Sequence, residues 1–101
     1  MEITKSQLRK NPATLTRVID SNAVVIFLSD NYDDSLKKEV YIFNDTATEI
    51  WNLIDGRKSI RQIARAILPG YDSPPKKIQE SVVKFVDKLM ENRLIEAGKA
   101  N

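Results

Sequence analysis

The residues that could do chemistry gather in one short stretch, residues 30–34 (DNYDD), where three carboxylates invite a calcium-loop interpretation. A calcium loop of the EF-hand type starting at Asp30 needs an oxygen ligand at its third position, glycine at its sixth and a bidentate glutamate at its twelfth. The sequence has Tyr32, Ser35 and Tyr41 at these positions. We therefore interpret the stretch as a polar turn and predict no metal site.

Composition removes most other catalytic chemistry. The 101-residue chain has no His and no Cys, so imidazole bases, thiolate nucleophiles, disulfides and nitrogen or sulfur metal ligands are all absent. Three glycines cannot assemble a phosphate-cradling loop. No carboxylate pair lies in an apolar setting that would tune it for proton transfer. The sequence predicts a protein that is not an enzyme, with no catalytic residue and no cofactor.

Charge and hydropathy restrict the partners. Sixteen Lys and Arg against fourteen Asp and Glu give a net charge of +2, and in residues 76–93 (KKIQESVVKFVDKLMENR) the signs alternate. Such alternation is typical of a solvated helix surface, so nucleic acid is not favoured as a partner. The N-terminus has no signal-peptide pattern, and the longest apolar run, residues 23–28, is too short to cross a bilayer. We predict a cytoplasmic protein with no membrane partner.

Three β-rich runs open the chain, at residues 14–20 (TLTRVID), 23–29 (AVVIFLS) and 39–43 (EVYIF). The continuously apolar second run is typical of a strand that is covered on both faces or paired on both edges. Turn residues at 20–22 and a polar loop at 30–38 connect the runs. Connections this short favour an antiparallel meander, which leaves the third strand at an edge of the sheet.

After Phe43 the apolar period changes to that of helices. Three helices are predicted, opening with a Thr46–Glu49 capping box, with a Ser59–Gln62 capping box, and with a Ser73 cap followed by Pro74. They end at Gly56, at Pro69-Gly70 and near Arg93. The fold class is therefore α+β, with three strands followed by three helices. Residues 1–12 are expected to be a flexible lead-in, 13–96 a single domain and 97–101 a frayed tail after a short extended piece.

The third helix has a wider apolar arc than docking requires. Residues Ile78, Val82, Phe85, Val86 and Leu89 form one stripe, which is enough to dock a helix. Two apolar residues, Val83 and Met90, widen the stripe on one flank, with Gln79 between them. The flank is open to two interpretations: a more deeply buried helix, or a groove wall for a partner. Trp51, on the apolar face of the first helix, is interpreted as core.

The third strand is open to a similar choice. No charge or proline interrupts it from Val40 to Phe43, although natural sheet edges are usually blunted by such residues. An open edge can bind an extended peptide as an added strand, with backbone bonds giving affinity and side-chain pockets giving selectivity. The same edge could instead serve for homodimerisation.

Residues 43–64 (FNDTATEIWNLIDGRKSIRQIA), 71–75 (YDSPP) and 82–95 (VVKFVDKLMENRLI) resemble the PqqD-like family of peptide recognition elements in ribosomally made, post-translationally modified peptide pathways. The resemblance covers about residues 40–96. It implies a winged-helix-like fold without catalysis, a cleft between the third strand and third helix that takes a precursor's leader peptide, and delivery to a radical SAM enzyme, a cyclase or a leader peptidase. The implied leader contacts are Val40, Tyr41, Ile42, Phe43, Gln79, Val83, Val86 and Met90.

The chain also departs from the family pattern. Asn92-Arg93 replaces the usual glycine before Leu94-Ile95, which predicts that Asn92 takes the left-handed conformation. The first forty residues match poorly, so a lasso or radical SAM-modified peptide fits at least as well as the pyrroloquinoline quinone (PQQ) pathway. The alternative from another class is a winged helix-turn-helix DNA-binding protein, but the mixed charges on the third helix argue against it.

Overall fold

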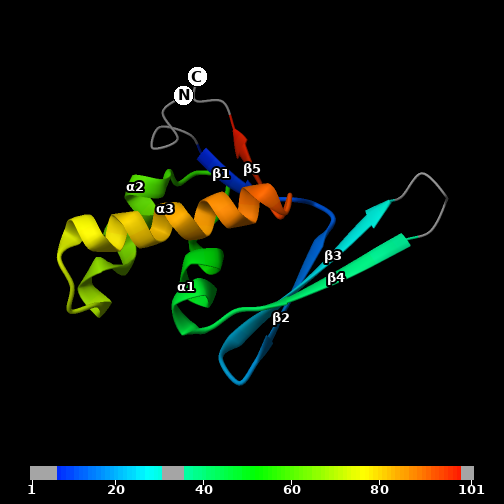
Figure 1. Ribbon diagram of the computed structural model, residues 1–101, viewed down its shortest axis with the longest axis horizontal. Helices are drawn as coiled ribbons and strands as arrows, with labels where there is room; N and C mark the ends of the chain where they lie inside the picture. Colours follow the sequence, from blue (N-terminus) through cyan, green and yellow to red (C-terminus); the bar gives the residue numbers. More distant parts are fainter. Residues whose placement is uncertain (1–6, 31–35, 99–101) are drawn as a thin grey trace.

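A computed structural model describes residues 7–30 and 36–98 (Figure 1). Within these ranges the strands precede the helices, except for one short strand at the C-terminal end. The elements are β1 (Gln7–Lys10), β2 (Thr14–Ile19), β3 (Asn22–Asp30), β4 (Leu36–Ile42), α1 (Asp45–Leu53), α2 (Ile60–Ile67), a 3-10 turn η2 (Leu68–Gly70), α3 (Pro75–Glu91) and β5 (Ile95–Gly98).

Strands β2, β3 and β4 form an antiparallel meander in that order, as the sequence predicts. The β2–β3 connection is a two-residue turn in which Asp20 (φ 51°) and Ser21 (φ 71°) are both left-handed, the geometry of a type I′ hairpin. Strand β4 begins at Leu36, three residues earlier than expected, so Lys37 and Lys38 lie within the strand instead of the loop before it. The polar loop interpreted as a turn, residues 31–35, lies outside the described residues.

The helices cover part of one face of this sheet, and the end of β3 and the start of β4 extend beyond them (Figure 1). On β3 the alternate residues Ala23, Val25 and Phe27 are buried beneath them. Trp51 of α1 is fully buried, which confirms its interpretation as core, and its indole N–H donates to Thr16 Oγ1 of β2 at 2.9 Å. This bond satisfies the only polar group of a large apolar side chain and joins α1 to the sheet.

The helix starts follow the sequence only in part. The Ser59–Gln62 capping box is present, with both reciprocal hydrogen bonds. The predicted Thr46–Glu49 box is wrong: α1 begins two residues earlier because Asn44 Oδ1 accepts from the Ala47 N–H at 2.8 Å. Helix α3 also begins one residue later than predicted, with Pro75 in its first turn and no side-chain cap.

Part of the expected lead-in is a strand. Residues Gln7–Lys10 pair with Ile95–Gly98 in a separate two-stranded sheet, and Leu8 is fully buried. The Leu8 backbone also donates to the Lys58 carbonyl (3.1 Å) and accepts from the Gly56 N–H (2.6 Å). Gly56 has φ 85°, the left-handed conformation predicted for it, but α1 ends earlier than predicted, at Leu53. The structured region therefore extends on both sides of the predicted limits of 13 and 96.

The end of α3 contains the left-handed residue expected there, but one position later than predicted. Asn92 has φ −90°, whereas Arg93 has φ 61°. The Arg93 N–H donates to the Met90 carbonyl (3.0 Å) and the Leu94 N–H to the Leu89 carbonyl (2.9 Å), which together form a Schellman motif. The Asn92 side chain instead donates to the Lys88 carbonyl (2.9 Å), so it caps the helix without leaving the right-handed region.

We expect Arg93→Gly to be more stable than Arg93→Ala by about 0.5–1 kcal/mol, because glycine has no Cβ to strain at positive φ. Both variants lose the side chain equally, so the difference isolates the backbone contribution. Urea unfolding of the two variants measures it. Equal stability, or a more stable alanine variant, would contradict the left-handed conformation of Arg93.

Candidate functional site

The free edge of β4 presents unpaired backbone groups. The Phe43 N–H donates to the Ala23 carbonyl of β3 at 2.9 Å, and the strand register pairs Tyr41 with Val25. In an antiparallel pair, successive residues direct their backbone groups alternately toward and away from the partner strand. Val40 and Ile42 therefore direct their N–H and C=O groups away from β3. Within the described residues no strand covers this edge.

Side chains alternate across β4 in the same way. Val40 (54% exposed) and Ile42 (77% exposed) stand on the sheet face turned away from the helices. Tyr41 and Phe43 stand on the helix-facing side, where Tyr41 is partly buried and Phe43 is 7% exposed. Of the four predicted strand contacts, three thus lie at an accessible edge, whereas the Phe43 side chain belongs to the core.

Phe43 determines which flank of α3 lies next to β4. Its ring is edge-to-face with Trp51 of α1 (centroids 5.6 Å apart) and with Phe85 of α3 (5.4 Å). Phe85 is partly buried, so it offers apolar surface beside the end of β4. The helix flank next to the candidate edge is therefore the one that carries Phe85.

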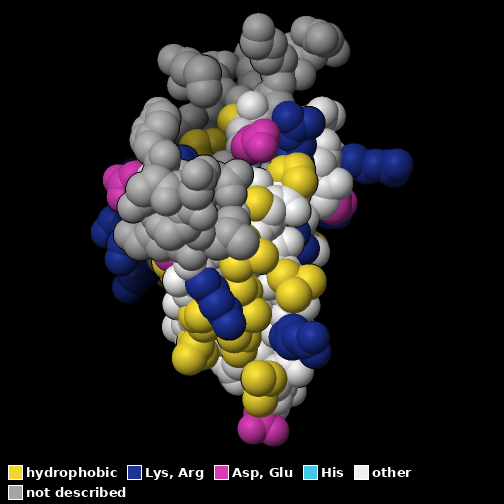
Figure 2. Space-filling view, turned by 90° about the vertical axis from the view of Figure 1, so that its right-hand side faces the viewer, with side chains coloured by type: hydrophobic (Ala, Val, Ile, Leu, Met, Phe, Trp, Pro, Cys, Tyr) yellow, Lys and Arg dark blue, Asp and Glu magenta, His cyan; other side chains and the backbone are white. Residues whose placement is uncertain are grey.

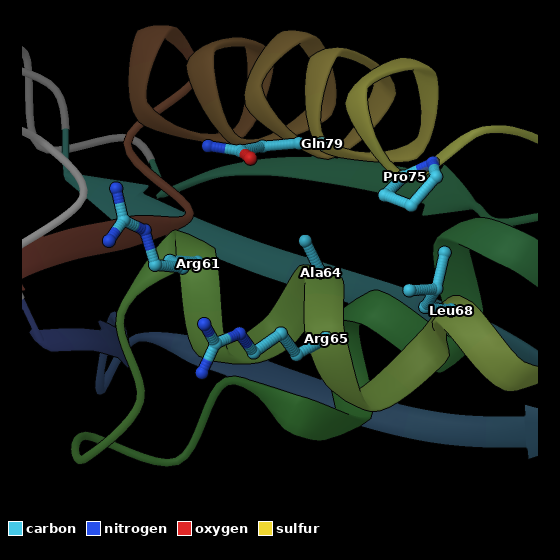
Figure 3. Close-up of a pocket in the computed structure, with 6 residues that line it drawn as sticks. All are labelled: Arg61, Ala64, Arg65, Leu68, Pro75 and Gln79. Carbon is cyan, nitrogen blue, oxygen red and sulfur yellow. The ribbon is translucent and has the colours of Figure 1, made fainter.

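The predicted helix contacts lie elsewhere. Gln79 lines a hollow of about 330 Å³ between α2 and α3, together with Arg61 and Arg65 of α2 (Figure 3). Gln79 and Val83 also line a neighbouring hollow of about 480 Å³ on α3. Val86 is fully buried and Met90 is partly buried. Gln79 and Val83 thus line hollows of α3 that contain no β4 residue, and the four helix contacts stay predictions.

The apolar arc of α3 indicated the flank that carries Val83 and Met90, but it could not show which side of the helix lies next to β4. A helix period gives the angle between side chains and not the direction in which the helix is docked. Phe85, predicted to belong to the docking stripe and not to the leader contacts, is the α3 residue that packs on Phe43 next to β4. The aromatic residues of the sequence could have indicated it. Phe43, Trp51 and Phe85 have large apolar rings, and such rings commonly pack against one another in a core.

Tyr41 carries the main electrostatic feature near the edge. Its hydroxyl donates to Glu39 Oε1 at 2.5 Å. This bond, with partial burial and the negative charge of Glu39 acting in the same direction, raises the pKa of Tyr41 to about 12, while the charge of Arg93 opposes the rise. The Arg93 guanidinium lies over the Phe27 ring, 5.9 Å from its centroid. The helix-facing side of β4 therefore has one neutral phenol between an acid and a base.

Neither a cluster of metal ligands nor a membrane-spanning helix is found in the described part of the chain. No three His, Cys, Asp or Glu side chains in residues 7–30 and 36–98 are grouped so that they could hold a metal ion. Nor does any helix within those ranges have the length and apolar character that a membrane span requires.

Solved structures share this fold. TbiB1 in complex with the TbiA(β) leader peptide superposes with a TM-score of 0.71 at 19% identity, covering 92% of this chain and 99% of that one. A lasso peptide synthetase B1 complexed with the leader peptide gives 0.69 at 22% identity, covering 89% and 98%. The PqqD truncation of Methylobacterium extorquens PqqCD, described as a stand-alone recognition element, gives 0.64 at 21% identity, covering 88% and 87%.

The strand order, the three helices and these likenesses define the winged-helix-like fold of recognition elements for ribosomally synthesised and post-translationally modified peptides (RiPPs). The family described as coenzyme PQQ synthesis protein D (PqqD) matches residues 23–95, and the chain belongs to this family. As a member, it is a non-catalytic domain. No curated protein gives a significant match.

We expect Tyr41→Phe to reduce stability below pH 10 and to lose this effect as pH rises to about 12. The folded-state pKa is raised above the unfolded value of 10.0, so the stabilisation is complete below 10 and disappears through the folded pKa. Urea unfolding of both proteins across this range measures the difference. An ultraviolet difference titration of wild type against variant reports the same phenol. A Tyr41 transition at pH 10 in the folded protein would contradict the assignment.

Proposed function

We propose that this protein is a stand-alone recognition protein that binds the leader of a ribosomally made precursor peptide by adding it to β4 as an extra strand. The observation that carries the proposal is the open edge at Val40 and Ile42, whose backbone groups have no partner strand in the described structure. Family membership and the two solved relatives that hold leader peptides support it.

The geometry suggests how such a peptide is held. Its backbone pairs with the outward N–H and C=O groups of Lys38, Val40 and Ile42. Alternate side chains of the peptide then point toward Tyr41 and Phe85, which are both partly buried and can bury further apolar surface. Arg93, an exposed cation close to Tyr41, favours an acidic leader residue at that end. Gln79, Val83 and Met90 would contact a leader only if it continued around α3.

The bound leader is presented to a modifying enzyme, a radical SAM enzyme, a cyclase or a leader peptidase, in a lasso-type or PQQ-type pathway. The presence of a lasso peptide synthetase and a PqqD protein among the solved relatives supports either pathway. We place the protein in the cytoplasm, where precursor peptides are made, and assign recognition to residues 13–96 together with the β1–β5 pair.

Amide NMR titration with the leader half of a small peptide encoded beside this gene tests the proposal. We expect shifts concentrated at residues 38–42 and near Phe85. Val40→Pro removes one outward N–H. The β3–β4 hydrogen bonds are kept because the Val40 N–H points away from β3, and proline is tolerated at sheet edges. It should lower leader affinity about 2- to 10-fold, the value of one hydrogen bond.

The matched control is Val18→Pro. Val18 pairs with Ala23 and directs its N–H away from β3 at the opposite edge of the same sheet. This variant should leave leader affinity unchanged. Equal weakening by both prolines, or none by either, would contradict binding at β4. A flat spectrum with the leader alongside shifts on adding duplex DNA would instead favour the DNA-binding alternative, whose affinity should fall steeply with salt.

A further inference from the structure

The face of the β2–β3–β4 sheet turned away from the helices, here called the outer face, is apolar. Strand register places Leu15, Ile26 and Val40 in one row across the three strands, and Val24 and Ile42 are adjacent in the next row. The most exposed apolar side chains of this face are Leu15 (54%), Ile19 (58%), Leu28 (47%), Val40 (54%) and Ile42 (77%). Figure 2 shows hydrophobic side chains gathered in one area, with Lys and Arg beside them.

This arrangement is unusual for a solvated sheet face. Antiparallel sheets with one face in water normally alternate apolar and polar residues, yet β3 is apolar on both faces from Ala23 to Leu28. Single exposed apolar residues are ordinary, whereas a contiguous exposed patch typically marks an interaction site. The apolar sequence of β3 is explained on one face by the helices and on the other by no described element.

The charges on the outer face indicate the chemistry of a partner. On the three strands, the charged side chains described on this face are Arg17, beside Val24, and Lys38, beside Leu28. Both are cations. Two copies of this chain packed face to face would bury these cations without a described carboxylate on either outer face to pair with them. A partner with an apolar patch and carboxylates at its rim would instead neutralise both.

The outer face is also continuous with the candidate peptide edge. Val40 and Ile42 contribute their backbone to the edge and their side chains to the outer face. A peptide strand added to β4 extends the sheet, so every second peptide side chain stands next to Val40 or Ile42 on this face. A protein docked on the outer face would therefore also contact the carried peptide.

We propose that the outer face docks the peptide-modifying enzyme, through an apolar patch with carboxylates that meet Arg17 and Lys38. The proposal rests on the proposed function, because it assigns a second surface to the same recognition protein. In this arrangement the enzyme and the leader bind adjoining surfaces of one sheet, so that the enzyme reaches the precursor while the leader stays paired with β4.

The test uses the full chain and the purified radical SAM enzyme, cyclase or leader peptidase encoded beside this gene. Isothermal titration without leader gives the enzyme affinity, and a separate titration gives the leader affinity. Leu15→Glu, on the strand farthest from β4, should weaken enzyme binding at least tenfold and leave leader binding unchanged. Arg17→Glu, also on β2, should likewise weaken enzyme binding and leave leader binding unchanged, because it reverses one of the two outer-face charges.

The matched control is Val18→Glu on the same strand. Val18 is 62% exposed, similar to Leu15, but register places it on the opposite face of β2. It should change neither affinity, and urea unfolding verifies that both variants are folded. Unchanged enzyme affinity in Leu15→Glu would overturn the proposal, as would a wild-type dimer that this variant dissociates. Because enzyme binding is measured without leader, failure of leader recognition gives a different result, with enzyme binding intact and leader binding absent.

Discussion

The packing of Phe43 between Trp51 and Phe85 is the contact on which the rest of the structure depends. Phe43 is the first residue after β4 and the last before the turn into α1, and its ring contacts a helix on each side. Trp51 in turn reaches across to Thr16 of β2. One aromatic cluster thus joins the two outer strands of the sheet to α1 and α3.

This cluster also explains why an open edge can persist in a folded protein. A free strand edge is a hazard when the strand can move to find a partner or exchange with another chain. Here β4 is held at its end by buried aromatic packing and along its length by the ladder to β3. This packing fixes the position of the edge, which would limit the conformational entropy lost if a peptide strand paired with it.

The helices and strands could be predicted from the sequence, but the way in which the helices pack on the sheet could not. Hydrophobic period and turn residues gave the meander, the three helices and the edge position of β4, because these depend on neighbours in sequence. Two details failed for local reasons. Asn44, and not Thr46, is the N-cap of α1. Arg93, and not Asn92, has the positive φ. Asn44 and Thr46 are both good cap residues two positions apart, whereas the positive φ of Arg93 goes against intrinsic preference, because asparagine tolerates this conformation better than arginine.

The surroundings of the β4 edge could be predicted only in part. That Val40, Tyr41 and Ile42 lie on an edge strand could be predicted, because edge position follows from strand order. The choice among residues of α3 requires the rotation of a helix against a sheet, which depends on contacts between Phe43 and Phe85, 42 positions apart in the sequence. The strand at Gln7–Lys10 was missed because its partner, β5, lies at the other end of the chain.

The β1–β5 pair has a consequence for how this domain can be combined with others. Gln7 and Gly98 are opposite one another in the register, so the described chain enters and leaves the fold at one place, in a sheet separate from β2–β3–β4. In Figure 1 this place lies apart from the β2–β3–β4 sheet. A domain whose ends meet can be inserted into a loop of a larger enzyme, or circularly permuted, with little disturbance of either fold. The same recognition unit is thus suited both to an independent existence and to incorporation within a larger protein.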